Sequence, residues 1–108
     1  MRLDRILYDA AGHQIPPAIY YVRWVKKASG LIWDDVNKEL MPNPDLEDSA
    51  ILLEETGLTG SFPVWVPREI PPGVYDVICY KQGGSVPQNT DNIERQWDTS
   101  SPGSILGF

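Results

Sequence analysis

The stretch FPVWVPREIPPGVYDVICY, residues 62–80, decides the fold because it predicts two short strands joined by a proline-rich turn. Proline has no backbone N–H, which restricts it to edge strands, strand starts and bulges. Pro63 and Pro67 have the same parity, so both missing donors lie on one side of the first strand. We therefore predict that residues 61–66 form an edge strand with one paired side and one side protected from further pairing.

The alternation of the same strand divides its side chains between two faces. The face predicted to point into the core carries Phe62, Val64 and Val66. The opposite face carries Pro63, Trp65 and Pro67. Exposed apolar clusters often mark interfaces, and tryptophan is enriched where binding energy concentrates. These three residues are our candidate interface, and the alternative is that the chain's own C-terminal tail covers Trp65.

The turn that follows, PPGV at 71–74, suits a type II turn. Pro72 presets φ at the second position, and Gly73 accepts a positive φ at the third. The next strand is predicted to point Tyr75, Val77 and Cys79 inward. Cys79 is the only cysteine of the chain, so it cannot form an internal disulfide and is expected to be a buried thiol.

Further strands are predicted on both sides of this stretch. AIYYVRWVK, residues 18–26, is rich in β-branched and aromatic types, and Tyr20, Val22 and Trp24 share one face. A turn over 28–30 is expected to lead to a strand at 31–34. A hairpin with its turn at 10–12 is expected near the N-terminus, and IERQW at 93–97 is expected to be the last strand. In 43–55 we expect a turn at 43–47 and a strand at 49–55, although Asn43 and Pro44 could cap a short helical turn instead.

About seven short strands with no long amphipathic helix predict an all-β protein, a single antiparallel β-sandwich of the immunoglobulin-like kind. We assign residues 1–97 to this domain and residues 98–108, DTSSPGSILGF, to an extended C-terminal tail. Ile105, Leu106 and Phe108 of the tail are expected to dock on the domain or, with some preference, on a neighbouring chain.

Two segments carry a resemblance to known modules. LLEETGLTGSFPVWVPREIPPGVYDVICYKQGG, residues 52–84, resembles small immunoglobulin-like or prealbumin-like β-sandwich modules. SGLIWDD, residues 29–35, is similar to a segment of compact β-sandwich proteins among the virion proteins of tailed phages. The resemblance covers about residues 18–84. It implies a structural role, as a capsid decoration, neck or tail component that is made in the host cytoplasm, is not secreted and resides in the virion.

Charge and hydrophobicity exclude some partners. The net charge of −6 and the sequence pI of about 4.5 disfavour binding to nucleic acid, because the phosphate backbone repels an acidic surface. The densest basic group, Arg23, Lys26 and Lys27, is expected to be a solvated strand end. The start of the chain has no apolar signal region, and no run approaches the roughly 20 apolar residues that cross a bilayer. We therefore expect a protein partner, copies of the chain itself, or both.

Catalytic and metal-binding interpretations are weaker. The sole histidine, His13, lies in a predicted turn without a nucleophile motif, and the adjacent carboxylates at 34–35 and 54–55 are expected at solvated strand ends. The acidic stretch NPDLEDS at 43–49 offers oxygen ligands for calcium but lacks the spacing of an EF-hand, so a structural calcium site stays open. We predict no cofactor and no enzymatic activity.

The sequence therefore predicts a non-enzymatic structural or assembly protein. The alternative is a carbohydrate- or ligand-binding module, since four tryptophans and five tyrosines could supply rings on which sugars stack. Trp24 and Trp33 are expected in the core, which leaves Trp65, Trp97 and some tyrosines for such a platform.

Overall fold

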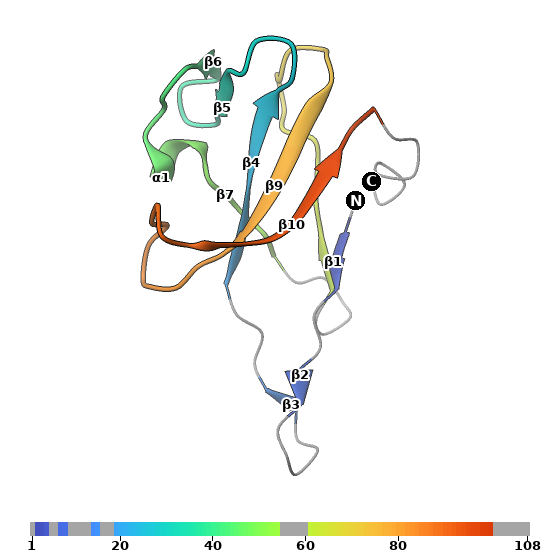
Figure 1. The fold of residues 1–108 in the computed structure, drawn as a ribbon, viewed down its shortest axis with the longest axis vertical. Helices are drawn as coiled ribbons and strands as arrows, with labels where there is room; N and C mark the ends of the chain where they lie inside the picture. Colours follow the sequence, from blue (N-terminus) through green and yellow to red (C-terminus); the bar gives the residue numbers. More distant parts are fainter. Residues whose placement is uncertain (1, 5–6, 9–13, 16–18, 55–60, 101–108) are drawn as a thin grey trace.

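The computed structural model describes residues 2–4, 7–8, 14–15, 19–54 and 61–100 of the chain. Strands dominate its regular structure, and every pairing between them is antiparallel (Figure 1). The helix found in this part of the chain, α1 (Leu46–Ser49), is a single turn. No helix in the described ranges is long and apolar enough to cross a membrane.

The main sheet is built around β4 (Tyr20–Lys26) and β9 (Tyr75–Lys81), which pair along their whole length of seven residues. Both strands are rich in the β-branched and aromatic residues that pack well on a pleated surface. Four further strands complete the sheet. β10 (Asn92–Asp98) pairs with β9. β7 (Ile51–Leu52) pairs with the start of β4 and β5 (Ile32–Asp34) with its end, and β6 (Glu39–Met41) pairs with β5.

Two short ladders stand apart from the main sheet. In one, β8 (Ser61–Pro63) pairs with β1 (Arg2–Asp4). In the other, β2 (Leu7–Tyr8) pairs with β3 (Gln14–Ile15), which confirms the predicted N-terminal hairpin; its turn at 10–12 lies outside the described residues.

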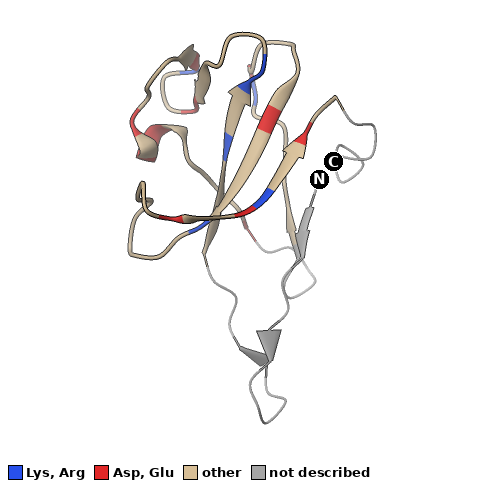
Figure 2. Cartoon of the chain, viewed as in Figure 1, with Lys and Arg blue, Asp and Glu red and all other residues tan. Residues whose placement is uncertain are grey.

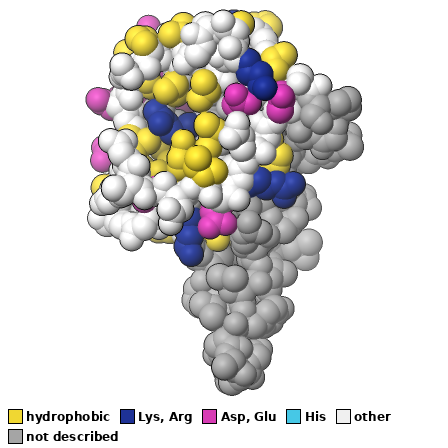
Figure 3. All heavy atoms as spheres, viewed as in Figure 1, with side chains coloured by type: hydrophobic (Ala, Val, Ile, Leu, Met, Phe, Trp, Pro, Cys, Tyr) yellow, Lys and Arg dark blue, Asp and Glu magenta, His cyan; other side chains and the backbone are white. Residues whose placement is uncertain are grey.

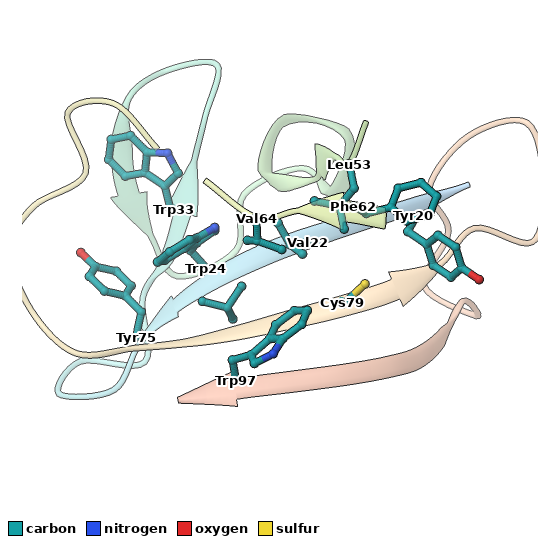
Figure 4. Close-up of a cluster of buried hydrophobic side chains, with 11 residues drawn as sticks. Tyr20, Val22, Trp24, Trp33, Leu53, Phe62, Val64, Tyr75, Cys79 and Trp97 are labelled. Atoms are coloured by element: carbon teal, nitrogen blue, oxygen red, sulfur yellow. The ribbon is translucent and has the colours of Figure 1, made fainter. Parts of the chain in front are cut away.

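The core lies between one face of the main sheet and the segment that runs through β8 (Figure 4). Register explains its composition, because residues directly opposite each other on paired strands share a face. Val22 lies opposite Cys79, and Trp24 lies opposite Val77, which in turn lies opposite Trp97. The buried core side chains are Tyr20, Val22, Trp24, Trp33, Leu53, Phe62, Val64, Tyr75, Val77, Cys79 and Trp97. The predicted inward faces of the strands at 18–26 and 75–79 are thus confirmed.

The all-β class is confirmed, whereas the complete sandwich stays a prediction. The layer that faces the main sheet is represented, within the described ranges, by the two three-residue strands β1 and β8 and the chain that follows β8. In those ranges β8 pairs with β1 and with no other strand, as expected for an edge.

The predicted strand at 61–66 is too long. β8 ends at Pro63, so the alternation of faces stops there and Val66, predicted to point into the core, is 50% exposed. In the described ranges the pairing of β8 with β1 ends at Pro63 opposite Arg2, and residues 64–66 have no partner strand. Phe62 and Val64 are buried as predicted.

Residues 43–55 also differ from the prediction. The amides of Asp48 and Ser49 donate to the carbonyl of Asp45, and this closes the turn of α1 where a non-helical turn was predicted. The strand expected at 49–55 is reduced to the two residues of β7.

The turn before β9 confirms one expectation and corrects another. Gly73 has the predicted positive φ, but at 153° it lies well beyond the roughly 80° of an ideal type II turn. The Tyr75 hydroxyl donates to the carbonyl of Pro71 over 2.6 Å, which fastens the proline-rich turn to the start of β9.

Candidate interaction surfaces

Trp65 is the most exposed of the four tryptophans, with 61% of its surface accessible. It lies just beyond β8, where the chain has left the ladder. Of its two predicted companions, Pro67 is partly buried, and Pro63 is buried, so the prediction of an exposed Pro63 is wrong. Pro63 is the last residue of β8, and it forms part of the wall beside the Trp65 ring instead of an exposed contact.

A hollow of about 170 Å³ lies beside Trp65. Its wall comes from β4, β7 and the residues around β8, namely Val22, Ile51, Leu52, Leu53, Glu54, Pro63 and Trp65. Leu52 is 59% exposed and Glu54 is also exposed, whereas Leu53 between them is buried. We call the exposed Trp65 ring and the lining of this hollow the Trp65 surface. Leu52 lies opposite Tyr21 in the ladder, so its side chain lies on the outer face of the main sheet.

The remaining tryptophans are buried, which was expected for Trp24 and Trp33 but not for Trp97. Only 7% of Trp97 is accessible, because it points into the core from β10, and the Arg95 guanidinium lies 5.3 Å from its ring centroid. Trp97 is therefore removed from the candidate sugar-binding platform. The Trp24 indole N–H is buried without a hydrogen-bond partner within the described part of the chain.

A second hollow, of about 200 Å³, adjoins the proline-rich turn. Its lining is mainly apolar and consists of Trp24, Val66, Ile70, Pro71, Pro72, Gly73, Tyr75 and Thr99. The polar groups near it are already engaged, since the Tyr75 hydroxyl donates to Pro71 and the Thr99 hydroxyl accepts from the Tyr75 amide. Burial raises the pKa of the Tyr75 hydroxyl, so this group is no proton acceptor at neutral pH. The hollow therefore offers a partner apolar contact area, whereas the hydroxyls of Tyr75 and Thr99 are already engaged in hydrogen bonds.

The outer face of the main sheet, which points away from the core, is partly apolar as well (Figure 3). Tyr21 lies opposite Tyr80, and their rings stack at 5.2 Å. Ile78 lies opposite Arg23, and Ile93 on β10 is 59% exposed beside Tyr80. The sequence did not indicate this face, because the partners of Tyr21 and Arg23 lie on β9, more than 50 positions away along the chain.

Of the basic group predicted to be a solvated strand end, Lys27 is exposed and Arg23 is partly buried. Arg23 donates through Nε to the Ser49 hydroxyl over 2.9 Å. Lys27 lies between two carboxylates, 2.7 Å from Asp98 on β10 and 3.3 Å from Asp76 on β9. Acidic positions on β9 and β10 are visible in Figure 2. The hydrogen bond from Lys27, followed by those from Ser100, lowers the pKa of Asp98 to about 2. The pKa of Lys27 is raised, chiefly by its bond to Asp98.

Asp91 holds the loop between β9 and β10. Its carboxylate accepts hydrogen bonds from the amides of Gln88 and Gly83 and, over 2.7 Å, from the hydroxyl of Tyr21. These bonds lower the pKa of Asp91, with the Gln88 amide contributing most. Burial and the neighbouring Asp91 raise the pKa of Tyr21 far above its ordinary value. Asp91 thus has a structural role that its sequence context did not reveal.

The candidate catalytic and metal residues are not brought together where they are described. Asp34 was expected to be solvated but is buried, and it accepts bonds from the amides of Val36 and Asn37 and from the Asn37 side chain. These bonds, led by that from the Asn37 amide, lower its pKa and close a turn after β5. No group of three or more potential metal ligands occurs among the side chains that the structure describes.

Three predicted features lie outside the described residues: His13, Glu55, and the tail residues Ile105, Leu106 and Phe108. The predicted domain boundary at 97/98 falls inside β10, which extends to Asp98. The ladder is prolonged by one more residue, because the Thr99 amide donates to the carbonyl of Tyr75.

Comparison of the chain with protein-family models, with curated proteins and with solved structures found no match. The surfaces described above are therefore the basis of the proposed function.

Proposed function

We propose that this chain is a non-enzymatic assembly protein that binds a larger protein, or further copies of itself, through the Trp65 surface. The observation that supports this proposal is a tryptophan ring that is 61% exposed beside an apolar hollow on an otherwise acidic domain. A large apolar side chain next to a recess gives a partner both an anchor and a place to insert its own side chain.

The physical basis is the burial of apolar surface. A tryptophan side chain buries about 150–250 Å² when it is covered, and interface tryptophans commonly cost at least about 2 kcal/mol when truncated. Elsewhere in the domain, the Asp34 carboxylate and the Tyr75 hydroxyl are engaged in holding turns, so they lend no support to a catalytic role.

The finer form of the proposal is a small virion component, a capsid decoration, neck or tail protein. It is supported by the resemblance of residues 18–84 to modules of tailed-phage virions. The sugar-binding alternative has less support, because three of the four tryptophans are buried, as are Tyr20, Tyr21 and Tyr75.

Photo-crosslinking tests the proposal for any partner protein. A photoreactive phenylalanine analogue replaces Trp65, and in a control it replaces Val86, which is 43% exposed in the β9–β10 loop. We expect a discrete covalent adduct from position 65 and none from position 86. Mass spectrometry of the adduct then distinguishes a second copy from a different protein, and a shell, neck or tail protein would support the virion role. Equal or no crosslinking at the two positions would exclude the Trp65 surface as the binding site.

A further inference from the structure

β7 has one unpaired edge in the described ranges, where β4 is its partner strand. The register on β4, continued by one residue, sets Leu53 opposite Tyr20, and the Leu53 amide donates to the Tyr20 carbonyl over 2.9 Å. Successive residues of an antiparallel strand direct their backbone groups alternately toward the partner and away from it. The N–H and C=O of Leu52 therefore point away from β4, and they have no hydrogen-bond partner among the described residues.

The hollow beside Trp65 lies along this edge. Ile51 and Leu53, on the core side of β7, form part of its wall, which Pro63 and Trp65 help to complete. Its volume of about 170 Å³ is enough for one apolar side chain, since a cavity of about 150 Å³ holds a benzene ring. A strand added to this edge would direct alternate side chains to the core side, and hence into the hollow.

The other outer strands of the main sheet are less suited to a further strand. β10 has a register irregularity between Ile93 and Arg95, and bulges of this kind limit pairing at an edge. The residues of β6 line neither of the two hollows described above. At β7, by contrast, unpaired backbone groups and a hollow occur side by side.

Glu54 defines the charge of a segment that fits this edge. With the alternation of β7 continued, its side chain lies on the same outer face as that of Leu52. Glu54 is exposed and forms no ion pair within the described part of the chain. Opposite charges directly across two strands stabilise their pairing, and like charges destabilise it. The net charge of −6 further favours a basic segment.

We propose that an extended segment of a partner protein adds to β7 as a further strand of the main sheet. Its backbone pairs with the N–H and C=O of Leu52, and one of its apolar side chains enters the hollow beside Trp65. A lysine or arginine on its other face pairs with Glu54. This inference rests on the proposed function, because it uses the Trp65 surface, and it adds the conformation and the chemistry of the partner segment.

The probe is a display library of random twelve-residue peptides that is selected on the full chain. The best peptides are synthesised, and their affinities are measured by calorimetry. We expect them to alternate apolar side chains, to carry lysine or arginine, and to lack proline in the paired stretch. Leu52→Pro removes the N–H at an unpaired edge, where proline is tolerated, and should weaken binding by roughly tenfold or more.

Leu52→Ala is the matched control, because it keeps the N–H and shortens only the outward side chain, so it should weaken binding much less. Circular dichroism establishes that each variant is folded. Amide hydrogen exchange gives a second readout that needs no variant: a bound peptide should slow the exchange of the Leu52 amide in the wild-type chain. Glu54→Lys should weaken the binding of basic peptides.

The inference is overturned if no peptide is selected, if folded Leu52→Pro binds the selected peptides as tightly as the wild type, or if the Leu52 amide exchanges equally fast with and without peptide. Equal binding of basic peptides to Glu54→Lys and to the wild type would overturn the assigned charge. Tighter binding of a synthetic peptide of residues 101–108, SPGSILGF, would overturn the assignment to a partner protein and make the chain's own tail the occupant.

The two proposals can fail separately. A position-65 crosslink that persists in folded Leu52→Pro would reject the added strand and leave the proposed function standing. Slowed exchange at Leu52 without any crosslink from position 65 would retain the added strand and reject Trp65 as the anchor.

Discussion

The end of β8 at Pro63 explains which side chains around Trp65 are buried and which are exposed. The ladder of β8 ends at Pro63, so three successive residues, Phe62, Pro63 and Val64, are all buried, and Trp65 and Val66 are both exposed. A regular strand would instead have divided these five side chains alternately between two faces. The exposed indole therefore results from the place where the strand stops.

Phe62 and Val66 provide a matched pair for this account. Phe62 packs edge-to-face on Tyr20 at 5.3 Å between ring centroids, whereas Val66 is half exposed. We expect Phe62→Ala to lower the free energy of unfolding by about 3–5 kcal/mol because it leaves a cavity in the core. Val66→Ala should change it by no more than about 0.5 kcal/mol. Urea denaturation of both variants checks the pair.

Equal destabilisation by these two substitutions would contradict this placement and would support a regular strand at 61–66 with Val66 in the core. An unchanged stability in Phe62→Ala would contradict the placement of Phe62 against Tyr20.

Among the elements, β10 depends on electrostatic contacts at its end. Lys27 follows β4 and binds both Asp76 on β9 and Asp98 on β10, so one side chain joins three neighbouring strands. Each pair is partly exposed to solvent, and the contribution of such pairs falls as salt screens them.

Asp98 gives this part of the sheet a defined pH dependence. Its pKa in the folded chain is about 2, below the value of about 3.9 expected in the unfolded chain. The stabilisation by Asp98 is therefore present above about pH 4 and is lost as the pH falls through about 2. Asp98→Asn should be less stable than the wild type at pH 7, and the difference should shrink between pH 4 and pH 2.

Thermal melts of both proteins across this pH range, at low and at 1 M salt, provide the measurement. A difference that stays constant with pH would show that the carboxylate charge of Asp98 contributes nothing to stability.

The sequence predicted the long elements well and the short ones poorly. β4 and β9 have seven residues each with a clear alternation, so their inward faces could be read from Tyr20, Val22, Tyr75 and Val77. α1 and β7 have four and two residues, and local propensity over such short lengths is overridden by tertiary bonds. The contact of Ser49 with Arg23 spans 26 positions, and no local pattern contains it.

The candidate site was predicted in part for the same reason. Strand parity predicted the exposure of Trp65 correctly but for the wrong reason, because β8 ends two residues before it. The hollow beside Trp65 depends on the pairing of β7 with β4, which the sequence alone did not indicate. Trp97 shows the reverse error, because the register of β10 on β9 places it opposite Val77 in the core.

The whole molecule is a small acidic domain with a net charge of −6 and one exposed tryptophan, Trp65, beside a hollow at the edge of the main sheet. The negative charge disfavours unspecific contacts with other acidic surfaces. Association is therefore expected to depend on specific apolar contacts such as that of Trp65.

The most direct measurement of this claim is the molar mass in solution by light scattering over a hundredfold concentration range. The samples are the full chain, Trp65→Ala, and a chain that ends at Ser100, which keeps the Thr99 contacts and lacks Ile105, Leu106 and Phe108. We predict that the full chain exceeds its monomer mass of 12.1 kDa as the concentration rises, and that Trp65→Ala reaches the same mass only at roughly 30-fold higher concentration, because its affinity falls by about that factor. The shortened chain reports whether the tail contributes to the same contact. A full chain and a folded Trp65→Ala variant with the same mass at every concentration would contradict assembly through the Trp65 surface.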